Sequence, residues 1–179
     1  MNTPAHIACG ACLAYMLAQA TVGRRNTRMR LALVGTGAVA LGIFSHLVLD
    51  LFPHYAWIVY LVWFKPLPFH WLIREAVFSL AIAVPVFIFA GKSWLFVALG
   101  MFGAIYPDVE KILSLDFHVP DVFILFDWHS TRLSSQTAGL SLLLLTIAEC
   151  IIIGVFLLVM WKMKQRASKH DTLSLPIEP

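Results

Sequence analysis

The sequence predicts an all-α integral membrane protein with about five transmembrane helices and an interfacial loop at its outer face. Of its 179 residues, 60% are hydrophobic and only 13% are charged, whereas about 25% of the residues in a soluble domain are charged. A domain of this size cannot bury so much apolar surface in its own core, so we expect lipid to cover much of it. The composition excludes a disordered chain and a disulfide scaffold, and the net charge of +3 gives no reason to expect nucleic acid as a partner.

Apolar stretches follow one another along the chain. A transmembrane helix needs roughly 20 mostly apolar residues. The stretches that reach or approach this length are 5–22, 31–52, 72–91 and 138–161. A fifth stretch, 93–107, is shorter, and it either ends below the membrane surface or continues past Pro107. Residues 55–64 are too few to cross, and their Trp and Tyr side chains are typical of an aromatic belt at the membrane interface.

The distribution of Lys and Arg orients these five spans. If residues 23–30 lie inside, nine of the 13 basic residues fall on the cytoplasmic side and four fall outside. The positive-inside rule favours this arrangement in the inner membrane, with the N-terminus outside and the C-terminus cytoplasmic. We therefore expect a transmembrane helical domain over residues 1–161 and a cytoplasmic tail over residues 162–179.

The same topology gathers most of the other ionisable groups at one membrane face. Six of the seven histidines and seven of the ten acids fall at the outer ends of spans or in the outer loop 112–137. Glu149 differs, because it lies midway along the last span, where it must face protein, be protonated, or both. The outer face is therefore where we expect a functional site.

The strongest local signal is the run from Ser45 to His54, Ser-His-Leu-Val-Leu-Asp-Leu-Phe-Pro-His. A helix places His46 and Asp50, four residues apart, on one stripe. An imidazole and a carboxylate placed in this way can bind Zn²⁺ or another borderline divalent ion. Pro53 disfavours helix at the residue before it, so His54 can fold back over the same site. The alternative is that Asp50 only orients His46 as a polar clasp between helices.

Three further groups are candidate ligands or catalytic residues. His6 follows Thr3 and Pro4, which fit a helix start and place this histidine at the depth of Asp50. Asp108 follows Pro107 at a predicted helix end, and Glu110 points the same way only if the chain there is extended. In the outer loop, His129 is a candidate ligand and Arg132 could hold a phosphate or carboxylate. Simpler alternatives are a solvated helix end for Asp108 and an aromatic interfacial loop for the segment around His129.

These residues give the chain a resemblance to the membrane-bound metal-dependent hydrolase family. That family shares a T-P-x-H opening and two helix ends, S-H-x-x-L-D and G-x-x-x-P-D. The matching segments here are Thr3–His6, Ser45–Asp50 and Gly103–Asp108, with His129-Ser130 similar to the family's loop histidine. The run from His46 to His54 also resembles the metal-ligand helix of zinc-dependent phospholipase C proteins. Many relatives have Asp where this chain has Glu110 and two loop histidines where it has one, so a site with a single ion is expected.

The sequence and the resemblance together predict a metal-dependent hydrolase acting on a lipid-like or phosphoester substrate. The expected ligands of a divalent ion, Zn²⁺ above all, are His6, His46, Asp50 and Asp108, with His54 and His129 as further candidates. Asp108 or Glu110 would serve as general base, and Arg132 would stabilise the negative charge that develops during the reaction. The alternative is a non-enzymatic accessory subunit whose polar face clasps a membrane protein partner. A transporter, which would rest on Glu149, is disfavoured because no inverted repeat is evident.

Overall fold

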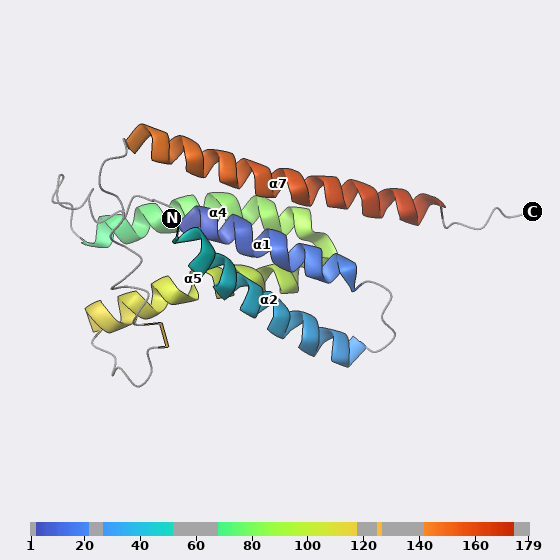
Figure 1. Ribbon diagram of the computed structural model, residues 1–179, viewed down its shortest axis with the longest axis horizontal. Coiled ribbons are helices and arrows are strands. Elements are labelled where there is room, and N and C mark those ends of the chain that lie inside the picture. The colour runs from blue at the N-terminus through green and yellow to red at the C-terminus, as the bar shows by residue number, and fades with distance from the viewer. Residues whose placement is uncertain (1–2, 22–26, 52–67, 118–124, 127–141, 174–179) are drawn as a thin grey trace, which may run out of the picture.

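The computed structural model describes residues 3–21, 27–51, 68–117, 125–126 and 142–173 (Figure 1). Within these ranges the chain forms α-helices and one short 3-10 helix, and it contains no strand. The elements are α1 (Thr3–Ala20), α2 (Thr27–Leu49), α4 (Pro68–Ala90), η1 (Gly91–Ser93), α5 (Trp94–Phe117) and α7 (Leu142–Leu173). The all-helical class that the composition predicted is confirmed.

Two helices continue beyond the stretches that hydropathy defines. The α5 helix contains Pro107 and continues to Phe117. Of the two outcomes expected for the stretch 93–107, the helix therefore takes the second and continues past Pro107. Proline removes one backbone donor and crowds the carbonyl of the residue four positions earlier. Here that residue is Gly103, which has no side chain to add to the crowding. The α7 helix crosses the expected domain boundary at 161 and ends at Leu173, so the first part of the expected tail is helical.

The α1 helix is the centre of the structure, and α2, α4, α5 and α7 all pack against it. Its buried alanines, at positions 5, 8, 11, 14 and 18, are completely inaccessible to solvent. Side chains three or four residues apart share a helix face, and small ones let the neighbouring backbones come close. Tyr15 of α1 and Met101 of α5 are among the larger side chains of the main apolar cluster.

Glycine makes a very close helix crossing possible between α2 and α5. A Cβ atom added to Gly42 would overlap the carbonyl oxygen of Gly100, and one added to Gly103 would overlap that of Val39. The two backbones therefore touch where a larger residue would separate them. This crossing brings the C-terminal end of α2 against α5, close to Asp108.

The helices alternate in direction. Figure 1 shows α1, α4 and α7 beginning at the same end, while α2 and α5 return to it. At the opposite end Arg30 ties α2 to α1, because its Nη2 donates to the carbonyl oxygen of Ala18 at 3.2 Å. Lys164 similarly donates to the carbonyl oxygen of Phe89 at 2.8 Å, which joins α7 to the end of α4. Cations suit such helix C-termini because the carbonyls there lack intrahelical partners.

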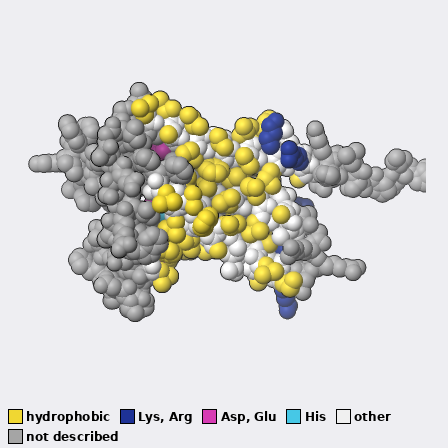
Figure 2. Space-filling view, in the orientation of Figure 1, with side chains coloured by type: hydrophobic (Ala, Val, Ile, Leu, Met, Phe, Trp, Pro, Cys, Tyr) yellow, Lys and Arg dark blue, Asp and Glu magenta, His cyan; other side chains and the backbone are white. Residues whose placement is uncertain are grey.

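Within the described residues, two helical segments are long and apolar enough to cross a membrane. They are Arg28–Leu49, within α2, and Ala76–Glu110, which runs from α4 through η1 into α5. Their mean hydropathies are 1.9 and 2.0, and only 33% of the most apolar stretch of each is buried. The core helix of a soluble protein would be mostly buried. Apolar side chains cover much of the face shown in Figure 2. Phe44, Ile88 and Ile151 are among the large apolar side chains that are exposed. These features indicate association with a membrane.

Candidate metal centre

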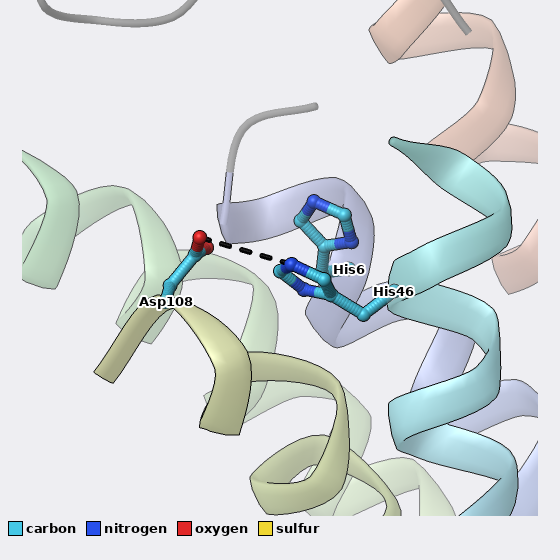
Figure 3. Close-up of side chains that lie close together, drawn as sticks. All are labelled: His6, His46 and Asp108. Carbon is cyan, nitrogen blue, oxygen red and sulfur yellow. Dashed lines mark ion pairs between the residues drawn. The ribbon is translucent and has the colours of Figure 1, made fainter. Parts of the chain in front are cut away.

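Four of the six predicted ligands come together at one end of the helices. His6 lies in the first turn of α1, His46 in the last turn of α2, and Asp50 just after α2 ends at Leu49. Asp108 comes from α5 and points toward the two histidines (Figure 3). Segments far apart in the sequence thus contribute to one cluster, which we call the His/Asp cluster: His6, His46, Asp50 and Asp108.

His46 is held by a backbone group as well as by the carboxylates. Its Nδ1 lies 2.6 Å from the carbonyl oxygen of Ala104. A carbonyl oxygen can only accept a hydrogen bond, so Nδ1 carries the hydrogen. The other nitrogen, Nε2, faces the carboxylates, 3.3 Å from Asp50 Oδ2 and 3.8 Å from Asp108 Oδ1. A histidine that ligates a metal characteristically donates its second N–H in this way, which fixes the tautomer and the ring orientation.

Asp50 contacts both histidines of the cluster. Its Oδ1 lies 3.1 Å from His6 Nε2, and its Oδ2 lies 3.3 Å from His46 Nε2. The Asp50 amide donates to the carbonyl oxygen of His46 at 3.0 Å, which continues the helical geometry and sets the four-residue spacing. The two imidazole rings stack, with centroids 3.9 Å apart and planes 23° apart.

The distances in the cluster suit a tetrahedral ion. His6, His46 and Asp108 each offer one ligand atom, and these atoms all lie within 4.8 Å of one another. Ligand atoms of a tetrahedral Zn²⁺ site are roughly 3.3 Å apart, because each lies about 2.0–2.1 Å from the ion. Within this three-residue group, His46 Nε2 and Asp108 Oδ1 lie 3.8 Å apart, close to that value. Asp50 is not part of the group, and its two oxygens lie at hydrogen-bond distance from the histidines, at 3.1 and 3.3 Å.

Charge also favours a cation among these residues. Two carboxylates face two imidazoles, and Asp50 is only 7% exposed while both histidines are fully buried. Removing an uncompensated carboxylate from water is costly. A protonated imidazole would neutralise one carboxylate and give the polar clasp, whereas a divalent ion would neutralise both. Asp108 forms the open side of the cluster, because its side chain is 35% exposed.

Glu110 does not belong to the group of potential ligand atoms. Two residues along a helix correspond to a rotation of roughly 200°, so Glu110 and Asp108 leave α5 on different faces. Glu110 is 2% exposed, and its Oε2 accepts hydrogen bonds from the backbone N–H groups of Leu125 and Phe126 at 3.0 and 2.8 Å. Asp108 and Glu110 would point the same way only in an extended chain, and α5 is helical at both residues. Glu110 instead joins the end of α5 to residues 125–126.

The remaining candidates, His54, His129 and Arg132, lie outside the described residues. The sequence reasoning missed two features of the site, the carbonyl of Ala104 and the stacking of His6 on His46. A carbonyl group carries no sequence signature, although the glycines at 100 and 103 do indicate a close helix approach in this region.

Comparisons with protein-family models, with curated proteins and with solved structures find no match to this chain. The interpretation of the cluster therefore depends on its own geometry.

Proposed function

We propose that this chain is a multi-pass inner-membrane protein that holds a divalent metal ion, with Zn²⁺ the best fit, in the His/Asp cluster. We further propose that it uses this ion to hydrolyse a lipid-like or lipid-linked phosphoester. The observation that carries the proposal is that His6, His46 and Asp108 each place a ligand atom within 4.8 Å of the others, with Asp50 in contact with both histidines. Nitrogen and carboxylate oxygen are ligands that suit Zn²⁺ and other borderline ions.

The proposed topology has five spans, with the N-terminus outside and the C-terminus in the cytoplasm. It is supported by the alternating helix directions and by the basic residues that lie away from the His/Asp cluster. Those in the described residues include Arg28, Arg30, Lys92, Lys162, Lys164 and Arg166. Dark blue side chains gather at this end in Figure 2. The positive-inside rule assigns such an end to the cytoplasm, which leaves the cluster facing outward.

In the proposed hydrolysis, each residue of the cluster has a distinct task. When bound, the ion would polarise a phosphoryl oxygen and acidify a water molecule. His46 is oriented by the Ala104 carbonyl, and Asp50 keeps His6 and His46 at a fixed spacing. Asp108, the most exposed member, is the residue that a substrate or water can reach, and it is our candidate for the proton acceptor. A site at headgroup depth favours a lipid-like phosphoester over a freely soluble one.

Metal analysis of the purified protein tests the binding step. We expect about one equivalent of metal in the wild type and a large loss in His46→Ala and Asp50→Ala. His170→Ala is the matched control, because residue 170 lies in the last turn of α7, at the opposite end of the structure. Equal, sub-stoichiometric metal in all four proteins would refute the metal site.

Two further measurements test the topology and the enzymatic step. Reporter fusions at residues 27 and 120 should report cytoplasm and exterior, respectively. A cytoplasmic signal from position 120 would contradict the proposed orientation. Metal-loaded protein with no activity on phospholipid and lipid diphosphate substrates would favour the accessory subunit. The outward apolar faces of α4 and α7 suit a membrane partner as well as lipid, and a stoichiometric partner should then copurify after mild solubilisation.

A further inference from the structure

A groove lies between α1, α2 and α7, away from the His/Asp cluster. Its volume is about 610 Å³, and its wall is almost entirely apolar. Leu13, Met16 and Leu17 of α1 form one side, and Leu41 of α2 and Met163 of α7 form the others. The groove is open to the surface, so an occupant would keep one side exposed. A further helix, 10–12 Å wide, would fill that volume in roughly one turn, whereas acyl chains are slender enough to run along it.

One cation lines this groove. Arg166 lies on the part of α7 that follows the apolar segment, one turn from Lys162. Among the residues that the structure describes, no acid forms an ion pair with Arg166. Gln19 also lines the groove, but its amide donates to Ser93 Oγ at 3.4 Å. The guanidinium is therefore the group in the groove that is available to an anion.

We propose that this groove binds an anionic phospholipid. An acyl chain of the lipid lies along the wall formed by α1 and α7, and its phosphate lies at Arg166. The apolar wall supplies the site for the chain. The guanidinium, which forms no ion pair with an acid in the described part of the chain, supplies charge complementarity for the headgroup. A planar guanidinium donates two parallel hydrogen bonds to a phosphate. Basic pockets between helices on the cytoplasmic side are suited to anionic headgroups. This binding needs membrane association and the proposed orientation, but it does not depend on the metal centre or on hydrolysis.

Native mass spectrometry of the detergent-solubilised protein tests the proposal, with phosphatidylglycerol and phosphatidylcholine of identical chains as probes. We expect phosphatidylglycerol to be retained more strongly. Arg166→Gln should reduce its retention about fivefold, which is the effect of one basic residue near a headgroup, and Arg166→Lys should preserve most of it. Lys162→Gln is the matched control, because Lys162 lies over the Trp161 ring at 5.1 Å and does not line the groove.

A second pair of variants tests the acyl-chain part of the groove. Ala167→Trp, which places an indole in the groove, should reduce retention of both lipids, whereas Gln165→Trp at an exposed position outside the groove should not. Equal retention of the two lipids would overturn the proposal. So would equal losses in Arg166→Gln and Lys162→Gln, or binding of glycerol 3-phosphate as strong as that of the lipid. A stable dimer that covers the groove without lipid would also overturn it. Metal content measured in the same samples separates this result from the test of the metal site.

Discussion

The ring of His6 stacks on the ring of His46 with centroids 3.9 Å apart, and one carboxylate, that of Asp50, lies within 3.3 Å of a nitrogen of each ring. Two imidazolium ions could not stack at this distance in a buried site without strong repulsion. The two rings therefore favour one added proton, or one metal ion held between them and the carboxylates, over protonation of both rings. This relationship links the N-terminus of α1 to the C-terminus of α2, and it makes Asp50 the central residue of the cluster.

We predict that Asp50→Asn weakens metal binding more than Asp108→Asn does. Asp50 is buried and contacts both histidines, whereas Asp108 is 35% exposed and lies 3.8 Å from His46. The Asp50 variant should lose more than about tenfold in metal affinity. Competition with a chelator of known affinity measures the difference. A larger loss in Asp108→Asn would show that the ion sits toward the open side of the cluster.

We predict that Gly42→Ala destabilises the protein by about 1–3 kcal/mol, the usual cost of overpacking. The added methyl group would overlap the backbone of α5 at Gly100, so the crossing of α2 and α5 must open. Gly154→Ala is the control, because nothing lies within 4 Å of its position and alanine favours the helix. Thermal unfolding in micelles should show a lower midpoint for the first variant only, and the same change should lower metal retention.

Arg30→Gln should lower the stability of the protein by about 1 kcal/mol. The change removes the hydrogen bond to the carbonyl oxygen of Ala18 and the contact over the Phe96 ring at 5.7 Å. Arg28→Gln removes the same charge from an exposed position on the same helix and should change little. If both variants unfold at the same temperature, the link between α1 and α2 contributes nothing measurable.

Glu110→Ala should speed the exchange of the Leu125 and Phe126 amide hydrogens with solvent. Both amides donate to Glu110 Oε2, and alanine offers no acceptor in its place. Glu110→Gln should preserve much of the protection, because an amide oxygen still accepts. Hydrogen exchange followed by mass spectrometry provides the measurement. A general base would behave differently, since Glu110→Gln would then abolish turnover while leaving amide exchange unchanged.

Part of the site could be predicted from the sequence because it follows from local geometry. His46 and Asp50 are four residues apart on a helix, so their common face needs no knowledge of the rest of the chain. Placing His6 and Asp108 beside them required the alternating directions of the helices, which hydropathy and the basic residues predicted. The role of Glu110 was beyond this reasoning, because its partners are backbone groups fifteen and sixteen residues further along the chain.

The sequence by itself determined the helical class and the apolar surface, since both depend on composition and on the lengths of hydrophobic runs. It also determined the spacing of His46 and Asp50. Only the tertiary structure decided that Ala104 orients His46 and that His6 stacks on it. It also decided that Asp108 forms the open side of the cluster and that an apolar groove leads to Arg166. These features depend on how closely and at what angle the helices pack, and that is set by glycine and alanine contacts between segments far apart in the chain.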